Sequence, residues 1–228
     1  MSTIEPSSLK VMSAVLTEEL PGSPVVALSG PSFALEVYQG QPTAVVAASE
    51  HEAAARDVQG VFATPRFRVY SHNDVIGVEL AGALKNVIAI AAGILEGLGL
   101  GNNPRAALIT RGLAEMTRLG VAMGANPLTF AGLAGMGDLI LTTTGALSRN
   151  RTLGVALAQG QTLEEYIATH RTVAEGVNTA QAALALARQV GTELPICAQV
   201  AAILFEGKPP QQAVGDLMER TLKSEQWR

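Results

Sequence analysis

A single lysine on an apolar helical face is the residue most suited to proton transfer. A helix is expected from residue 74 to about residue 96. Lys85 would share one face of it only with small or apolar residues, namely Val78, Ala81, Gly82, Ile88, Ala89 and Ala92. Burying an ammonium group is costly unless it is paired, so Lys85 is a candidate proton donor or acceptor. The alternative is that its stem packs while its amine reaches solvent.

An aspartate at an apolar helix start is the second candidate. Asp138 follows the glycines of Gly135-Met136-Gly137 and leads directly into Leu139 and further apolar residues. Aspartate is a preferred helix-capping residue, and a cap is one interpretation. The other is that its carboxylate pairs with Lys85, orients it and stabilises its charged form. The local sequence leaves both open.

Two short segments could bind an anion. Ser148-Arg149-Asn150-Arg151 follows Gly145 and precedes a helical stretch, which gathers hydroxyl, guanidinium and amide donors near a helix N-terminus. Such a place favours a phosphate. The turn Ser29-Gly30-Pro31-Ser32, between a strand and a helix start, is a second possible contact. Basic clusters on solvated turns are common, so neither segment is specific alone.

Other reactive residues form no pattern. His51, His72 and His170 lie far apart without metal-ligand spacing, and we expect no metal site. Cys197 is the only cysteine, which excludes an intramolecular disulfide, and we expect it to be buried. No nucleophile elbow or Walker loop occurs. The alternating glycines of residues 97–101 follow a helix, which is the wrong context for a dinucleotide.

Composition narrows the class of protein. The 228 residues are 48% hydrophobic, enough for a sizeable core, and carry a net charge of −4 without a block of like charges. This distribution argues against a nucleic-acid partner. The apolar run Val87–Leu95 is far short of the roughly 20 residues that span a membrane, and we expect a buried helix. The first six residues contain no secretory signal, so we expect a cytoplasmic protein.

The elements that must position these residues change character near residue 72. Buried strands are expected at 24–29 and 43–48, and a half-exposed strand at 66–70. Helices separate them, one from residue 32 to 40 and one opened by a capping box of Ser49 and Glu52. This βαβαβ pattern predicts a small parallel or mixed sheet, with a domain boundary at residue 72.

The remainder, residues 73–228, is expected to be all-α. The expected helix boundaries are marked by residues that cap helix starts and by glycines that end helices. The expected caps are Asn73, Asn103 and Asn126, the last two followed by proline, and Thr162 in a capping box with Glu165; the expected helix ends are Gly124, Gly160 and Gly191.

Five segments in this order resemble one family. They are residues 28–34 (LSGPSFA), 82–90 (GALKNVIAI), 108–116 (LITRGLAEM), 135–139 (GMGDL) and 148–150 (SRN). Together they resemble bacterial-type NAD(P)-dependent glycerol-3-phosphate dehydrogenase, from about Glu5 to Lys223. The resemblance implies a Rossmann domain followed by a helical domain like the C-terminal domain of 6-phosphogluconate dehydrogenase. It also implies NAD(P)H-dependent reduction of dihydroxyacetone phosphate to sn-glycerol 3-phosphate for phospholipid synthesis.

The resemblance also assigns roles. Lys85 would transfer the proton. Asp138 would hold the Lys85 side chain, and Thr142 would lie in the same site. The remaining substrate contacts would be Gly30, Ser32, Ser148, Arg149 and Asn150, and the cofactor contacts Ala34, Arg149, Val173 and Glu175. Glu175 could also form a capping box with Thr172. A homodimer is a further expectation.

The front of the chain departs from the family pattern. The strand, glycine-rich turn and helix that hold the pyrophosphate are missing, and so is a second family lysine, since Met1-Ser2-Thr3-Ile4 stands where it is expected. We therefore expect an N-terminally truncated enzyme with weak turnover, in which residues 1–72 are the remnant of the Rossmann domain. Two alternatives are a non-catalytic helical module for sugar-phosphate binding or dimerisation, and a related hydroxyacid dehydrogenase.

Overall fold

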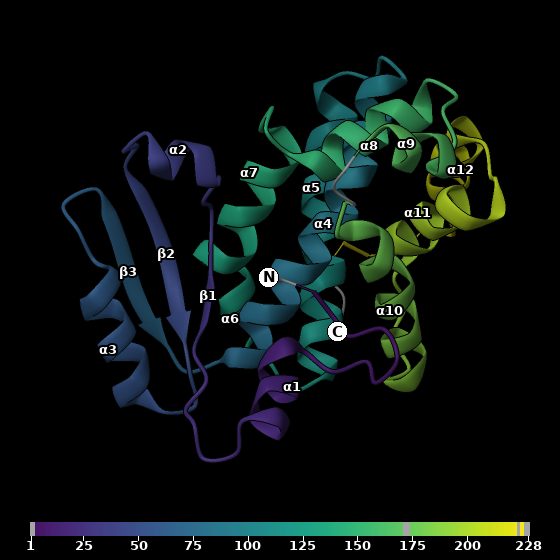
Figure 1. Cartoon of the computed structure of the whole chain (residues 1–228). Coiled ribbons are helices and arrows are strands. Elements are labelled where there is room, and N and C mark those ends of the chain that lie inside the picture. Colours follow the sequence, from purple (N-terminus) through teal and green to yellow (C-terminus); the bar gives the residue numbers. More distant parts are fainter. Residues whose placement is uncertain (1–2, 171–173, 223, 226–228) are drawn as a thin grey trace.

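A three-stranded mixed sheet lies beside a larger helical body (Figure 1). The computed structural model describes residues 3–170, 174–222 and 224–225. In the order β1-β2-β3, β1 pairs antiparallel with β2, and β2 pairs parallel with β3. The elements of this part are β1 (Ala27–Ser29), α2 (Ala34–Tyr38), β2 (Thr43–Ala48), α3 (Glu52–Phe62) and β3 (Phe67–His72). The predicted βαβαβ order is confirmed, with shorter β1 and α2 than expected. The expected burial of the first strand was wrong, since none of residues 24–29 is buried at this edge of the sheet.

The central strand is buried on both faces. Val45 and Ala47 pack with residues of β3 and α3 on one side. Val46 and Ala48 point the other way, toward the first turn of the long helix that follows the sheet. This alternation follows from the period of two in a strand, and it is why β2 is apolar throughout. The sheet is thereby fixed against the helical body.

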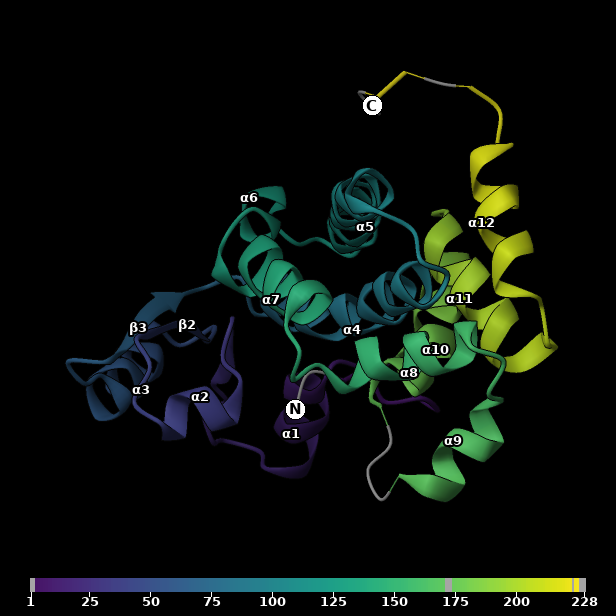
Figure 2. The ribbon, with the colours of Figure 1, turned by 90° about the horizontal axis from the view of Figure 1, so that it is seen from above.

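Helices make up the rest of the described chain. They are α1 (Met12–Glu19), α4 (Val75–Gly97), α5 (Asn102–Ala122), α6 (Pro127–Phe130), the π-helical turn η1 (Leu133–Gly137), α7 (Asp138–Thr144), α8 (Arg149–Ala158), α9 (Leu163–Thr169), α10 (Gly176–Gln189), α11 (Pro195–Glu206) and α12 (Pro210–Met218). Seen from above, α4 runs through the middle of this body (Figure 2). By length and composition α4 could cross a membrane, but 83% of its apolar window is buried inside the protein, as in a core helix. The expected buried helix is confirmed.

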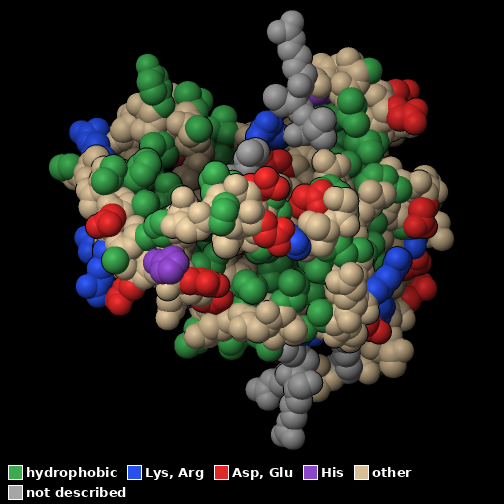
Figure 3. Space-filling model, turned by 60° about the horizontal axis from the view of Figure 1, so that its bottom comes forward, with side chains coloured by type: hydrophobic (Ala, Val, Ile, Leu, Met, Phe, Trp, Pro, Cys, Tyr) green, Lys and Arg blue, Asp and Glu red, His purple; other side chains and the backbone are tan. Residues whose placement is uncertain are grey.

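Ile4, Val11 and Ser13, in the segment before β1, contact the helical body. Ile4 and Val11 are buried in the same apolar cluster as the core of α4. Ser13, in the first turn of α1, donates its backbone N–H to the Glu79 carboxylate on α4 over 3.0 Å. The segment before β1 therefore bridges the two parts of the molecule. On the face seen in Figure 3, acidic and basic side chains are interspersed.

Glycines allow α4 and α8 to touch backbone to backbone. A Cβ on Gly93 would lie 2.0 Å from the carbonyl oxygen of Arg151, and a Cβ on Gly154 would lie 2.0 Å from that of Ile90. Neither glycine has a positive φ, so the requirement is space and not backbone conformation. Beside this contact the Arg151 guanidinium forms two hydrogen bonds to the Glu96 carboxylate, of 2.9 and 2.7 Å. Helix α8 is thus held in one position along α4.

Some helix starts differ from the predicted ones. Asp74, not Asn73, caps α4, because its carboxylate accepts the Gly77 N–H at 2.9 Å and also binds Asn126 and Thr129 on the neighbouring α6 segment. Asn103 does not cap α5, since that helix begins at Asn102, two residues earlier than expected, with Gly101 at the N-cap. The Asp74 carboxylate combines this local cap with its long-range bonds to α6, which the local sequence does not show.

The expected capping box before α3 was also wrong. The Ser49 hydroxyl donates to the Val25 carbonyl at 2.7 Å, which ties it to the chain before β1, and His51 takes the N-cap position. Other predicted helix boundaries are confirmed. Asn126 caps α6, Thr162 forms its capping box with Glu165, and three helices end before glycines of positive φ, namely Gly124, Gly160 and Gly191.

A buried glutamate caps α11 from another helix. Glu115 on α5 is 4% exposed, and its carboxylate accepts the backbone N–H of Ile196 at 2.7 Å and of Cys197 at 3.4 Å. Burial raises the pKa of Glu115 to about 7, against the opposing effect of these hydrogen bonds. Cys197 is buried, as expected, and burial raises the pKa of its thiol.

The contact between α4 and α8 predicts the effect of a single methyl group. Gly154→Ala should lower the free energy of unfolding by about 3 kcal/mol or more, because the new Cβ meets backbone that cannot rotate away. Urea unfolding measures the change. The matched control is Gly60→Ala in α3, where a Cβ meets nothing within 4 Å, and this variant should be stabilised by about 0.5–1 kcal/mol. An unchanged Gly154→Ala protein would contradict the proposed close contact.

The cap from Glu115 predicts a pH dependence of stability. Its folded pKa of about 7 exceeds the ordinary 4.5, so the folded state holds the proton more tightly than the unfolded state. The stabilisation is therefore complete below pH 4.5 and is lost as the pH rises to 7. Relative to Glu115→Gln, which does not titrate, wild-type stability should fall by about 3 kcal/mol over this range in urea unfolding. Parallel profiles of the two proteins would show that Glu115 is not the titrating group.

Candidate functional site

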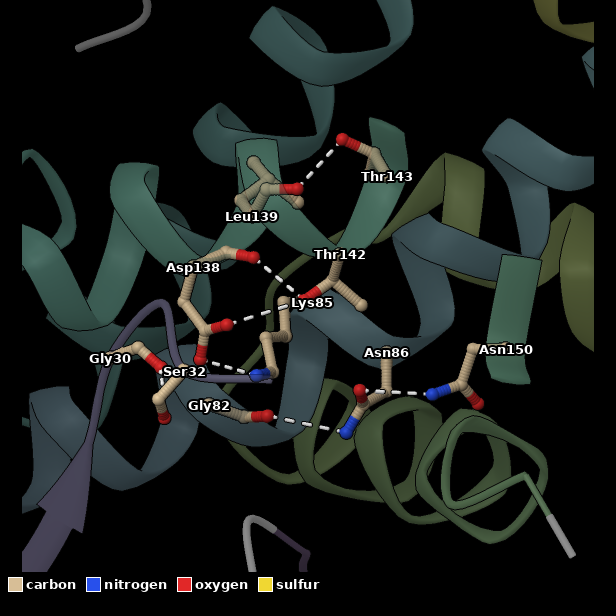
Figure 4. A network of polar contacts seen from close by, with 10 residues as sticks. All are labelled: Gly30, Ser32, Gly82, Lys85, Asn86, Asp138, Leu139, Thr142, Thr143 and Asn150. Carbon is tan, nitrogen blue, oxygen red and sulfur yellow. Dashed lines mark hydrogen bonds and ion pairs between the residues drawn. The ribbon is translucent and has the colours of Figure 1, made fainter. Parts of the chain in front are cut away.

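Lys85 and Asp138 form a nearly buried ion pair. Lys85 on α4 donates from Nζ to Oδ2 of Asp138, the first residue of α7 (Figure 4). The two side chains are 15% and 3% exposed. Asp138 makes no capping hydrogen bond to its own helix. Of the two interpretations that the sequence left open, the structure therefore has the pair and not the cap.

The surroundings of Asp138 set its electrostatics. Burial raises the pKa of its carboxyl, while the Lys85 ammonium and a hydrogen bond from Thr142 oppose that rise. The Thr142 hydroxyl lies 2.7 Å from the Asp138 carbonyl oxygen and 3.2 Å from Oδ1. Both carboxylate oxygens thus have a partner, and the lysine is held in one orientation.

A π-helical turn brings Asp138 to this position. The turn Leu133–Gly137 immediately precedes α7, and a Cβ on Gly135 within it would lie 2.1 Å from the Phe130 carbonyl oxygen. Only glycine fits where the chain folds back so closely on α6. The Gly-Met-Gly-Asp segment is therefore built for a tight approach that ends with a buried carboxylate facing α4.

The Ser148-Arg149-Asn150 segment meets the pair from α8. Ser148 is the N-cap of α8, and its Oγ accepts the Arg151 N–H at 3.3 Å. Asn150 is buried: its amide donates to Asn86 Oδ1 at 3.0 Å, and its Oδ1 accepts the Gly176 N–H at 2.9 Å. Arg149 between them is exposed. Of the three predicted anion donors, only Arg149 extends freely toward solvent.

These residues line one open pocket of about 590 Å³. It lies between α2, α4, α7, α8 and the start of α10. The predicted site residues that line it are Ser32, Ala34, Lys85, Asp138, Thr142, Ser148, Arg149, Asn150 and Glu175. Val173 and Thr172 lie outside the described residues, so the expected contact of Val173 and the expected capping box of Glu175 are not addressed by the structure.

Gly30 is not among the lining residues, and its local role is different. It has a φ of +141°, and a Cβ on it would lie 3.0 Å from the Cα of Val45 on β2. Its carbonyl accepts the Ser32 hydroxyl at 3.1 Å. Gly30 thus lets the turn after β1 pass over β2 and presents Ser32 at the pocket.

Five further residues line the pocket without having been predicted as site residues. They are Phe33, Leu35, Asn86, Leu141 and Leu147. Asn86 directly follows Lys85, and Phe33 lies between Ser32 and Ala34, so their neighbours were the only signal in the sequence. The three leucines carry no chemistry that spacing could reveal. Only the fold brings them to the same wall.

The pocket has the size of a small-molecule site. Its volume falls within the usual range for small-molecule sites. Ala34 is small and exposed, which leaves the wall on the α2 side open. Glu175 is the N-cap of α10, makes no side-chain capping bond and also lines the pocket.

The ion pair predicts a variant whose stability depends on pH. Lys85→Met leaves Asp138 buried without its cation, so its carboxyl pKa should rise further and ionisation should oppose folding. Relative to wild type we expect a loss of about 3 kcal/mol at pH 8 and much less at pH 5, measured by urea unfolding. The control is Lys10→Met, which breaks an exposed pair with Glu18 and should cost under about 1 kcal/mol. Equal costs at both pH values would contradict the assignment.

Comparisons with known proteins show the family to which the chain is related. Residues 74–215 match the family described as NAD-dependent glycerol-3-phosphate dehydrogenase C-terminus, and residues 2–55 match the corresponding N-terminus family. The chain is 60% identical to glycerol-3-phosphate dehydrogenase (NAD(P)+) of Geobacter sulfurreducens over 229 residues, covering 98% of this chain and 68% of that relative. It is 63% identical over 201 residues to the enzyme of the same name in Trichlorobacter lovleyi, covering 88% and 60%.

Solved structures show the same likeness. The crystal structure of glycerol-3-phosphate dehydrogenase from Coxiella burnetii superposes with a TM-score of 0.91 at 45% identity, covering 94% of this chain and 66% of that one. The enzyme from Saccharomyces cerevisiae gives a TM-score of 0.83 at 29% identity, covering 95% and 65%. This chain thus spans about two thirds of the length of these relatives. Because both segments match over most of the chain, it belongs to the NAD-dependent glycerol-3-phosphate dehydrogenase family.

Proposed function

We propose that this chain binds dihydroxyacetone phosphate and sn-glycerol 3-phosphate in the pocket and transfers the proton of their interconversion. The observation that carries the proposal is the Lys85–Asp138 pair, nearly buried in a pocket that an exposed arginine also lines. A charged amine and a guanidinium on one small pocket suit a substrate with a reacting oxygen and a phosphate. Membership of the family supports the same substrate pair.

Lys85 is the proposed catalytic residue. Its Nζ donates a proton to the carbonyl oxygen in the direction of reduction and accepts it from the hydroxyl in the direction of oxidation. Asp138 orients the amine and balances its charge, while Thr142 fixes the carboxylate. When bound, the nicotinamide supplies or accepts the hydride. Because the pair is nearly excluded from water, the developing charge on the substrate oxygen is stabilised by a fixed cation.

Arg149 is the proposed phosphate ligand. It lies in the first turn of α8, where free backbone N–H groups and the helix dipole also attract an anion. The Ser148 hydroxyl accepts one backbone N–H and keeps its own hydrogen for a phosphate oxygen. The Asn150 amide is bonded to Asn86 and to the Gly176 backbone, so we assign it mainly to holding α8 in place. Ser32 would complete the substrate contacts, with Gly30 acting through the turn.

Several finer assignments belong to the same proposal. Ala34, Arg149 and Glu175 would contact the cofactor, NADH or NADPH. Residues 1–72 would act as part of the nucleotide-binding domain and residues 73–228 as the catalytic domain, although Ile4 and Val11 pack with the latter. The protein would act in the cytoplasm and could associate with a second copy. Because the chain spans about two thirds of its relatives, ligand binding is the first property to test.

Calorimetry with sn-glycerol 3-phosphate tests the site. Wild type should bind it, and should bind glycerol, which lacks the phosphate, at least about tenfold more weakly. Arg149→Ala should weaken binding of the phosphate ester by about 10- to 100-fold, because a charged phosphate contact is lost. The matched control is Arg188→Ala, an exposed arginine on α10 outside the pocket, which should bind like wild type.

The outcomes separate the functions considered. Absence of binding by wild type, or an Arg149→Ala protein that binds as tightly as wild type, would refute the proposed phosphate site. Turnover is then followed as NADPH oxidation with dihydroxyacetone phosphate. Binding that depends on Arg149 without any turnover would favour a non-catalytic sugar-phosphate module. Tighter binding of a carboxylate analogue than of the phosphate ester would favour a hydroxyacid dehydrogenase.

A further inference from the structure

The turn after β1 lies along α7 from one end of that helix to the other. At the start of α7, a Cβ on Gly137 would lie 3.6 Å from Cγ of Pro31. At its end, a Cβ on Gly145 would lie 2.4 Å from Cε2 of the Phe33 ring. Helix α2, on the same side of the molecule as the sheet in Figures 1 and 2, begins directly after Phe33. The turn and the helix therefore form one wall of the pocket.

Gly145 is required for space and not for its backbone conformation. Its φ of −74° and ψ of 136° are accessible to any residue. A side chain there would collide with the Phe33 ring and with the Leu141 carbonyl oxygen, which would lie 2.7 Å from the Cβ. The absence of a side chain at Gly145 thus leaves the space that the Phe33 ring occupies.

Gly145 is the first residue of the segment between α7 and α8, which leads to Arg149, the proposed phosphate ligand. The Ser148 N–H donates to the Gly145 carbonyl at 3.2 Å, which closes a turn over Gly145–Ser148. Ser148 then caps α8, and Arg149 is the first residue of that helix. A displacement of Gly145 would therefore also displace this short turn and the Arg149 guanidinium that follows it.

Phe33 is not part of the hydrophobic core. Among the described residues it belongs to none of the three buried apolar clusters, although it is half-buried and lines the pocket. Its ring comes from the sheet part, whereas Gly145 and Arg149 belong to the helical body. The contact joins the two parts at the pocket that they share.

We propose that Phe33 is a positioning residue: by pressing on Gly145 it fixes the Gly145–Ser148 turn and thereby aims Arg149 at the substrate phosphate. This inference rests on the proposed function, because it requires Arg149 to bind the phosphate. Phe33 itself makes no polar contact with the ligand. Its effect is confined to ligands that carry the phosphate.

Binding of sn-glycerol 3-phosphate by the full chain tests this role. Phe33→Ala should weaken binding about fivefold, and Phe33→Leu, which refills most of the volume, by less than about twofold. In an Arg149→Ala background, Phe33→Ala should change the affinity by less than about twofold, because the residue through which it acts is gone. The matched control is Tyr38→Ala, which removes an aromatic side chain of α2 that is 90% exposed, and it should bind like wild type.

Three results would overturn the proposal. One is wild-type affinity in Phe33→Ala. Another is an equal loss with and without Arg149, which would mean that Phe33 acts independently of it. If circular dichroism shows that Phe33→Ala is unfolded, Phe33→Ile replaces it in the same cycle, and additivity with Arg149→Ala again refutes the role. Failure of the proposed function is distinct from these, because then wild type itself does not bind or Arg149→Ala has no effect.

Discussion

The close packing of α4 on α8 is the constraint on which the site depends. Gly93 and Gly154 leave no side-chain atoms between the two backbones, so each helix rests on the carbonyl groups of the other. Dispersion contacts between the backbones are strongest at this distance and fall off quickly as helices separate. About two turns earlier on α4 and one turn earlier on α8, Asn86 and Asn150 hydrogen bond across the interface. The position of Arg149 relative to Lys85 therefore follows from where glycines occur.

Two buried carboxylates, those of Asp138 and Glu115, each hold two segments of the fold together, but with different partners. Asp138 and Glu115 are both nearly excluded from water, and burial raises the pKa of each. Asp138 is balanced by an ammonium group and faces the pocket. Glu115 is balanced by two backbone N–H groups and faces the start of α11. The first arrangement places an ammonium group on the pocket, whereas the second caps the start of α11.

The pocket is made from both parts of the molecule. The turn after β1 supplies Ser32 and Phe33, and the helical body supplies Lys85, Asp138 and Arg149. Because β2 is packed on α4 through Val46 and Ala48, and the segment before β1 packs on the helical body, the two parts are tied together at several places. A site of this kind depends on the relation between the parts as much as on either one.

The sequence by itself determined the order of the strands, the burial of α4 and the place of Lys85 on an apolar helical face, because these depend on periodicity and on which residues share a helical face. It also predicted the caps at Asn126 and Thr162, whose partners lie within three residues. Only the tertiary structure decided that Asp138 pairs with Lys85, that Asp74 replaces Asn73 as a cap, and that Ser49 binds the chain before β1. Ser49 and Asp138 have their partners 24 or more residues away, and Asp74 binds Asn126 in addition to its local cap at Gly77. A local pattern cannot rank such partners, because the free energy of burying a polar group depends on what the folded chain brings beside it.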